Sequence, residues 1–230
     1  ATVLATNAAN ATAKNWKVQY YNDDTDIPTT TGTYVCGTPH LDTYITLTVK
    51  SGEAIRLDFE AAADGTPVRI VSGSNTQDIT VGTDWKGTAS YTANASTMTI
   101  YGNLIGFDCS ENGVNLTALD PSHNTQLTQL DCYDNSFNSL DISQNTQLTQ
   151  LDCSSNQLSS LDISHNTQLT QLDCYGNNFT TATLDDIYCA LPDRTRKTNG
   201  KIQPVYNSSS SNHATVLATN AANATAKNWK

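Results

Sequence analysis

The stretch Leu127-Thr-Gln-Leu-Asp-Cys132 decides the fold, because the same six residues return twice. The later copies begin at Leu148 and Leu169, so the period is 21 residues. A looser copy starts at Leu104, and each copy reaches an Asn three residues after its Cys. These residues are Asn112, Asn135, Asn156 and Asn177. A fixed period in the twenties predicts coils that stack into a solenoid.

One coil supplies six apolar side chains that it cannot bury without a neighbour. They are Leu127, Leu130, Cys132, Phe137, Leu140 and Ile142, repeated in the next coil as Leu148, Leu151, Cys153, Leu158, Leu161 and Ile163. The alternation over residues 129–133 predicts a short strand with Gln, Asp and Tyr outward. The convex side of a 21-residue coil has no room for a full helix, so we expect extended or 3₁₀ segments there.

Two columns of Asn are predicted at opposite corners of the coils. The first consists of the four Asn residues that follow the cysteines, and the second of Asn124, Asn145 and Asn166 in the motif S-x-N-T-Q. A buried amide at such a corner is expected to satisfy backbone groups of adjacent coils, which are costly when left unpaired.

The pattern L-x-x-L-x-[LC]-x-x-N is that of a leucine-rich repeat. Coils of 21 residues with Cys in place of the third Leu resemble the internalin J-type, cysteine-ladder branch of bacterial leucine-rich-repeat proteins, over roughly residues 104–180. The flanks resemble, less specifically, those of surface proteins from gut and oral anaerobes. The resemblance implies adhesion or host interaction, an extracellular or bacterial cell-surface location, and no catalytic residue.

The chain has six Cys, of which Cys109, Cys132, Cys153 and Cys174 occupy equivalent repeat positions. Stacked coils place equivalent Cβ atoms about 4.8 Å apart, whereas a disulfide needs about 3.5–4.5 Å. We therefore expect free thiols that act as small core groups. A tetrathiolate metal site is not expected from a single column. Pairing of Cys36 with Cys189 stays open, and the apolar run 187–191 favours a buried Cys189.

Residues 1–17 recur letter for letter at 214–230. Their Ala-rich composition predicts a helix, followed in the first copy by the strand 18–21. Next to the predicted strand at 200–206, the second copy is expected to cap the last coil. The first copy would then be the tail of a preceding unit, and it predicts head-to-tail self-association as one alternative.

The fold class is therefore α/β and strand-dominated, with about four coils between two flanks. The predicted segments are 1–21 (duplicated segment), 22–42 (linker), 43–103 (β-rich module), 104–180 (repeats) and 181–230 (C-terminal cap). The β-rich module is expected to be sandwich-like, with strands near 43–49, 54–60, 68–71, 78–81, 90–92 and 97–101. Its length suggests little core of its own. In the cap, one helix is expected to bury Leu184, Ile187, Tyr188 and Leu191.

The net charge of −10 is concentrated in the repeats, since no Lys or Arg occurs between Lys86 and Arg194. Twelve acidic residues lie in that interval. Nucleic acid is excluded as a partner, because phosphate contacts need positive charge. A basic protein surface would suit this charge, as would a divalent cation. With no signal peptide, initiator Met or transmembrane stretch, we expect a mature fragment of an exported protein without direct membrane insertion.

The outward column Asp108–Asp131–Asp152–Asp173 places carboxylates about 5 Å apart. A retaining glycosidase pair has similar spacing, but identical repetition on an open sheet indicates architecture, so we expect no enzyme. No cofactor is indicated, although calcium stays an alternative despite the missing D-x-D-x-D-G loop. The simplest expectation is a solvated column bonded to Gln and Thr. His123 and His165 are likewise expected to be solvated.

Tyr133 and Tyr175 occupy the same outward position two coils apart, as exposed aromatic anchors of a binding surface do. We therefore predict a non-enzymatic protein-binding or adhesion module that uses the concave face of the repeats. The predicted binding residues are Gln129, Asp131, Tyr133, Gln150, Asp152, Gln171, Asp173 and Tyr175. The alternative is a structural spacer or self-associating unit of a tandem array.

Overall fold

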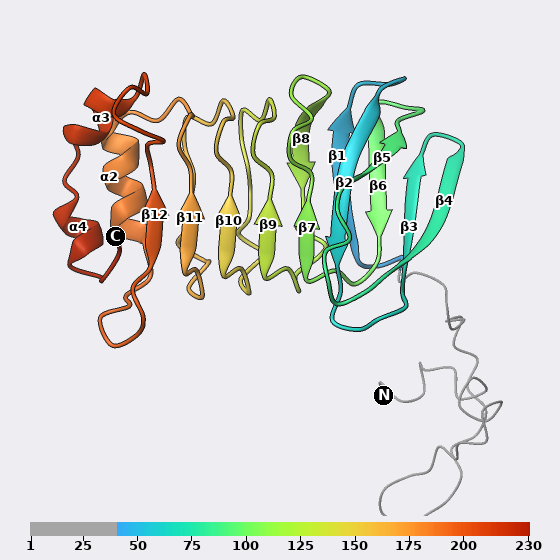
Figure 1. The fold of residues 1–230 in the computed structure, drawn as a ribbon, viewed down its shortest axis with the longest axis horizontal. Coiled ribbons are helices and arrows are strands. Elements are labelled where there is room, and N and C mark those ends of the chain that lie inside the picture. The colour runs from blue at the N-terminus through green and yellow to red at the C-terminus, as the bar shows by residue number, and fades with distance from the viewer. Residues whose placement is uncertain (1–40) are drawn as a thin grey trace, which may run out of the picture.

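The computed structural model describes residues 41–230. The first copy of the duplicated segment (1–21), almost all of the 22–42 linker, and Cys36 therefore lie outside the described residues. Within them, a row of short strands runs from a β-rich module at one end to a group of helices at the other (Figure 1). The strand-dominated solenoid predicted from the period is confirmed.

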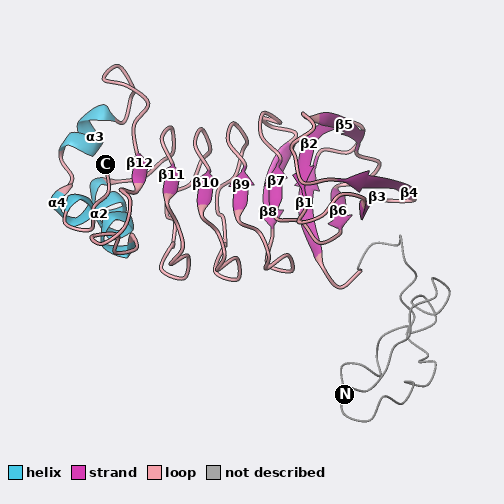
Figure 2. Ribbon diagram, turned by 60° about the horizontal axis from the view of Figure 1, so that its bottom comes forward, coloured by secondary structure: helices cyan, strands magenta, loops and turns pink. Residues whose placement is uncertain are grey.

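Each coil contributes one three-residue strand to a parallel sheet. Their order is β12 (Lys201–Gln203), β11 (Gln171–Asp173), β10 (Gln150–Asp152), β9 (Gln129–Asp131) and β7 (Gly106–Asp108). Leu130 pairs with Leu151, and Leu151 with Leu172, so the register does not shift. Equivalent side chains consequently form columns with a spacing of about 4.8 Å. Figure 2 shows the coils as narrow loops, with no helix between residues 104 and 180.

The interior of the coils consists of the predicted apolar side chains. Those of the two central coils are at most 8 % exposed. Cys109, Cys132, Cys153 and Cys174 are free and fully buried, as expected. Cys189 is exposed, so its predicted burial is wrong. The helix that carries it turns other side chains toward the last coil.

Both Asn columns make the predicted contacts between coils. Asn156 Nδ2 donates to Cys132 O in the preceding coil (3.0 Å) and to Cys153 O in its own (3.2 Å), while its Oδ1 accepts from Phe137 N (3.0 Å). At the other corner, Asn145 Nδ2 donates to Pro121 O and Asn124 O. The two columns differ in one respect. Among the described residues, no hydrogen bond reaches the buried Oδ1 atoms of Asn124, Asn145 and Asn166.

The turn after each strand has a left-handed residue two positions beyond the buried cysteine. The residues are Glu111 (φ 60°), Asp134 (φ 52°), Ser155 (φ 52°) and Gly176 (φ 66°). This conformation is uncommon for residues other than Gly. Here it recurs because the following Asn holds the turn with its side-chain amide. The same turn in every coil sets the direction of the outward side chains.

Six predicted strands form the β-rich module. They are β1 (Tyr44–Val49), β2 (Ala54–Glu60), β3 (Thr66–Ser72), β4 (Asn75–Val81), β5 (Ala89–Thr92) and β6 (Thr97–Tyr101). β8 (Leu116–Asp120) of the first coil joins a sheet of order β4-β3-β6-β1-β8. β2 pairs antiparallel with β7, and β5 with β2, so the repeat sheet continues into the module.

The module was expected to have little core of its own, and its buried residues belong to one apolar cluster that continues through the repeats. Ile45, Leu47, Ile55, Leu57 and Ile100 are all fully buried. Strands of five to seven residues bury more apolar surface than the pattern of short segments suggested. The aromatic rings of Phe59 and Phe107 lie 5.8 Å apart and connect this core to the first coil.

The other end of the solenoid is covered by α2 (Thr181–Ala190), which begins where Thr180 Oγ1 accepts from Thr183 N. As predicted, it buries Leu184, Ile187 and Tyr188. The single helix predicted over 214–230 is wrong, since α3 (His213–Leu217) and α4 (Ala222–Thr225) are separate. Thr219 Oγ1 bonds to Val216 O (2.6 Å), and Asn220 N donates to Asp185 Oδ1 (2.7 Å), so local and tertiary bonds interrupt the helix.

Candidate binding face

The outward side of the repeat sheet, here called the repeat face, carries three columns of side chains. One column is Gln129, Gln150 and Gln171, which are directly paired across β9, β10 and β11. The second is the Asp column, in which Asp108, Asp131, Asp152 and Asp173 are paired in the same way. The third follows the cysteines and consists of Ser110, Tyr133, Ser154 and Tyr175. All eight predicted binding residues therefore belong to one surface.

The Asp column is not solvated as expected. Asp173 is 6 % exposed, and Asp108, Asp131 and Asp152 are half-buried. Gln129 Nε2 donates to Asp131 Oδ2 (2.8 Å), and Gln171 Nε2 to Asp173 Oδ2 (2.6 Å). These bonds are the predicted Gln contacts. Each carboxylate is covered by its neighbours on the adjacent strands, because the strands are straight and closely spaced.

Burial and like charge act together on this column. Burial, followed by the charges of Asp108, Asp152 and Asp173, raises the pKa of Asp131 to about 6, against the bond from Gln129. Burial also raises the pKa of Asp152, opposed by hydrogen bonds from Ser154 and by Lys201. Adjacent carboxylates at this spacing cannot all ionise freely. The repeat face therefore holds negative charge that its own residues leave largely uncompensated.

The two tyrosines of the third column are held in different ways. Tyr133 donates its hydroxyl to Glu111 Oε1 (3.1 Å), and burial together with this bond raises the pKa of Tyr133 to about 12. The ring of Tyr175 lies 5.3 Å from that of Tyr206. Ser154 occupies the equivalent position in the coil between those of the two tyrosines, and it is fully buried. Both rings are half-buried and present part of their surface to solvent.

Sequence reasoning missed the residues that border the repeat face. Asp58 of β2 pairs with Asp108 and extends the Asp column into the β-rich module. Arg56 forms an ion pair with Glu111 (2.8 Å), and Lys201 lies 3.6 Å from Asp173. The sequence contains a signal for the position of Asp58, because residues 56–59 (R-L-D-F) repeat the x-L-D-apolar pattern of the coil strands. The two cations stand at opposite ends of the face.

A loop after β4 covers the end of the repeat face nearest the module. Asp58 Oδ2 accepts from Gly87 N at 2.8 Å, so the loop is tied to the column. Trp85 occupies the space above Gly106, where a Cβ would lie 2.6 Å from Trp85 Cζ2. The accessible part of the repeat face therefore begins at β9.

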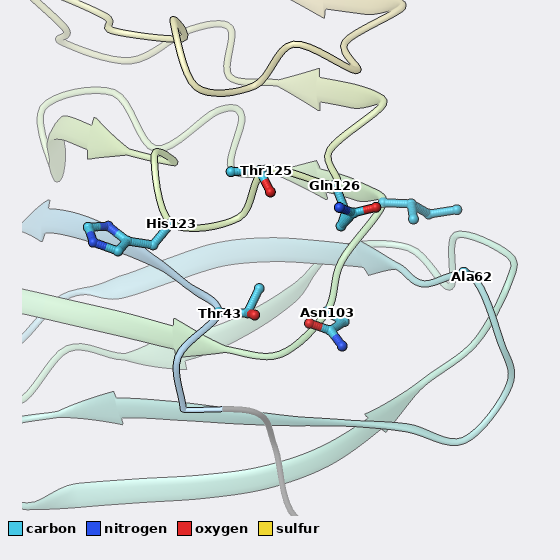
Figure 3. Close-up of a pocket in the computed structure, with 7 residues that line it drawn as sticks. Thr43, Ala62, Asn103, His123, Thr125 and Gln126 are labelled. Atoms are coloured by element: carbon cyan, nitrogen blue, oxygen red, sulfur yellow. The ribbon is translucent and has the colours of Figure 1, made fainter. Parts of the chain in front are cut away.

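Among the hollows in residues 41–230, two lie near the ends of the row of coils. One, of about 450 Å³, is lined by Ser155, Tyr175, Gly176, Tyr206, Ser210, Ser211 and Asn212, and so adjoins the repeat face. The other, of about 440 Å³, gathers residues from the start of β1, the end of β2 and the turn before β9 (Figure 3). Its only titratable side chain is His123. Its lining mixes apolar surface with the hydroxyl and amide groups of Thr43, Asn103, Thr125 and Gln126, a set that does not indicate catalysis.

The two histidines predicted to be solvated are exposed, but His123 also stacks on Tyr44, with ring centroids 4.2 Å apart. In residues 41–230, no group of three or more His, Cys, Asp or Glu is placed to hold a metal ion. No helix in the same part of the chain is long and apolar enough to cross a membrane. The repeat face combines carboxylates, amides and two aromatic rings, which is the chemistry of a recognition surface.

Comparison with known proteins identifies the coils. Residues 146–188 match the family model "Leucine Rich repeats (2 copies)". No curated protein matches the chain. Among solved structures, the functional domain of InlJ from Listeria monocytogenes, which includes a cysteine ladder, is 34% identical. That match covers 43% of this chain and 24% of the other, with a TM-score of 0.32.

Proposed function

We propose that this chain, whose residues 146–188 match leucine-rich repeats, binds a protein partner with a basic surface through its repeat face. Leucine-rich repeats are protein-interaction modules whose exposed sheet is the usual contact surface. The observation that carries the proposal is the Asp column, whose carboxylates repel one another and, within residues 41–230, form a single ion pair, that of Asp173 with Lys201. Lysine or arginine side chains of a partner would relieve that repulsion.

The eight predicted residues have distinct roles in this proposal. Asp131 and Asp152 would accept charge-assisted hydrogen bonds from the partner, and the buried Asp173 would add negative charge to the face. Tyr133 and Tyr175 would supply apolar area at little entropic cost, since both rings are already held by neighbours. Gln129, Gln150 and Gln171 would fix the register of the partner by hydrogen bonds.

The protein is proposed to act outside the cell or on a bacterial cell surface, as an adhesion module without enzymatic activity or cofactor. The raised pKa of Asp131 does not favour catalysis, because the same residue type repeats at every coil with no distinct second role. Calcium stays the alternative ligand of the Asp column. Calorimetric titration with CaCl₂ separates the two, since a protein-binding face needs no calcium.

The proposal is tested by screening purified extracellular domains against the full chain and four variants. Asp131→Asn/Asp152→Asn removes two charges from the repeat face. Asp141→Asn/Asp162→Asn removes two from the exposed opposite corner and serves as the matched control. We expect a genuine partner to bind the first variant about 30-fold more weakly or worse, and the control unchanged.

The third and fourth variants address the aromatic anchors. Tyr133→Ala/Tyr175→Ala is expected to cost at least about tenfold in affinity, and Tyr133→Phe/Tyr175→Phe much less, since the rings stay. Binding should also weaken as salt rises. If every partner found binds all four variants equally, the repeat face is not the binding surface.

A further inference from the structure

The C-terminal tail, residues 214–230, fits a specific site at the end of the solenoid, here called the tail seat. The seat is formed by α2, β12 and the segment between them. Trp229 is 1 % exposed, and its indole Nε1 donates to Pro192 O at 2.8 Å. A Cβ on Gly200 would lie 2.3 Å from Trp229 Cδ2, so the seat accepts the ring only because residue 200 is Gly.

Polar contacts make the seat selective for the sequence of the tail. Lys227 Nζ donates to Leu191 O (3.0 Å) and to Cys189 O at the C-terminal end of α2, whose own last turn has no basic residue. Unpaired carbonyls and the helix dipole favour a cation there. Asn228 has φ 63°, which Asn tolerates better than most residues, and its Nδ2 donates to Arg194 O (3.1 Å).

The tail also continues the sheet. Trp229 forms a parallel bridge with Gly200. Lys230 N donates to Gly200 O (3.0 Å), and Ile202 N donates to Lys230 O (2.8 Å). The tail is therefore added to the outer edge of β12 as one coil is added to the next. An edge of this kind is a template for another strand.

Every contact described above is made by a residue that the chain contains twice. Lys227, Asn228 and Trp229 correspond to Lys14, Asn15 and Trp16 in the identical segment 1–17. We propose that the tail seat is a self-recognition site, in which residues 1–17 of a second copy take the place of residues 214–230 and join molecules head to tail. This interaction is independent of the repeat face.

The residues that follow the first copy fit the same edge. They are Val18-Gln19-Tyr20-Tyr21. The N–H and C=O of one strand residue point to the same side, so Ile202 O faces the edge on which Ile202 N already donates to Lys230 O. In the exchanged arrangement Gln19 N would donate to Ile202 O. Pairing would end there, because Pro204 has no N–H.

Residues 214–230 of the same molecule compete for the tail seat with residues 1–17 of a second copy, and this competition decides how often the exchange occurs. The tail of the same molecule is tethered, and a short tether gives an effective concentration of about 1 mM. At micromolar protein its own tail therefore fills the seat. A change that weakens only the C-terminal copy reverses the balance. Loss of a buried Trp side chain weakens such a contact by about 100-fold or more.

The full-length variant Trp229→Ala tests the proposal, because its N-terminal copy keeps Trp16. We expect light scattering to show the unaltered chain and Trp16→Ala as monomers from about 1 to 100 µM, below the effective concentration of the tether. Trp229→Ala is expected to form concentration-dependent oligomers over the same range. Trp16→Ala/Trp229→Ala, the matched control, is expected to be monomeric.

A second measurement tests the proposal even if Trp229→Ala folds poorly. A fluorescent peptide of residues 1–17 is titrated into the milder variant Lys227→Ala/Asn228→Ala, whose circular dichroism is compared with that of the unaltered chain. We expect the peptide to bind, and a Trp16→Ala peptide to bind at least about 100-fold more weakly. Folded variants that stay monomeric and bind no peptide overturn the proposal. Oligomers that persist in Trp16→Ala/Trp229→Ala overturn it as well.

Discussion

The two sides of the same three-residue strands carry columns of identical side chains with opposite energetic consequences. Inward, Leu and Cys columns are fully buried, and the adjacent Asn column is hydrogen-bonded from coil to coil. Outward, the Asp column stacks like charges in the same register. Two ionised carboxylates about 5 Å apart repel by about 3 kcal/mol at an effective dielectric constant of 20, and by about 1 kcal/mol in water.

Repetition of a neutral, hydrogen-bonding group adds stability with each coil, whereas repetition of a charge subtracts from it. Asn at the outward position would preserve the bond from Gln129 without the repulsion. The inner columns are therefore explained by the fold, and the Asp column is not. This difference is the reason to search for function on the repeat face.

The largest expected effect concerns the burial of the inner side, and it is the difference in thiol reactivity between the buried cysteine column and the exposed Cys189 of α2. Burial raises the pKa of Cys132 and Cys153 well above the usual thiol value, so the thiolate is suppressed as well as hidden. We expect iodoacetamide at pH 8 to label the exposed Cys189 at least about 1,000-fold faster than Cys109, Cys132, Cys153 or Cys174 in the folded protein.

Peptide mass mapping measures the labelling of each Cys. In urea the buried cysteines and Cys189 should react at similar rates, which controls for intrinsic reactivity. Labelling of a single coil's cysteine at the rate of Cys189 under native conditions would show that this coil opens independently of its neighbours.

A second comparison lies within the interior, between the two Asn columns. Asn156→Ala removes the partner of three carbonyl groups and of Phe137 N. Asn145→Ala removes the partner of two carbonyl groups only. We expect a loss of about 3–4 kcal/mol in the free energy of unfolding for Asn156→Ala and about 2 kcal/mol for Asn145→Ala. Urea unfolding monitored by circular dichroism measures both.

The matched design cancels the volume of the deleted side chain, which is the same in both variants. The difference reports the acceptor role of Asn156 Oδ1 together with the additional bond from Asn156 Nδ2 to Ser154 O. Equal losses would mean that Phe137 N finds water or another acceptor when the Asn is removed.

The inner columns could be predicted completely because each member meets its own copy. Leu130 and Leu151 face the same environment in consecutive coils, so the period alone fixes register and burial. The module strands were also predictable, since alternation and Gly turns such as Gly52 and Gly65 are local signals. The eight residues predicted to bind lie on one face for the same reason.

The remainder depends on contacts that the period does not encode. The half-burial of Asp131 arises from lateral neighbours on other coils, and the pairing of Asp58 with Asp108 joins segments 50 residues apart. The exposure of Cys189 depends on which face of α2 meets the last coil. The break in the tail helix depends on Asp185, 35 residues before Asn220. Apart from the R-L-D-F pattern at residues 56–59, composition and spacing contain no trace of these tertiary choices.

The smallest of the three effects concerns the pH dependence of stability. The pKa of Asp131 is about 6 in the folded protein and about 3.9 in an unfolded chain. The folded state thus binds more protons between these values, and stability is lost as pH rises from about 4 to 6. The shift corresponds to about 3 kcal/mol at most, which partial exposure reduces to about 1–2 kcal/mol.

Asp131→Asn should therefore be more stable than the unaltered chain at pH 8, by about 1–2 kcal/mol, and equal to it near pH 4. The control is Asp162→Asn, because the backbone N–H of Ser164 lowers the pKa of Asp162, and its contribution is lost only as pH falls below 4. The control should keep the decline between pH 4 and 6. Urea midpoints across pH 4–8 measure these differences. An undiminished decline in Asp131→Asn would assign the pH dependence to other groups and remove the energetic distinction between the two sides of the strands.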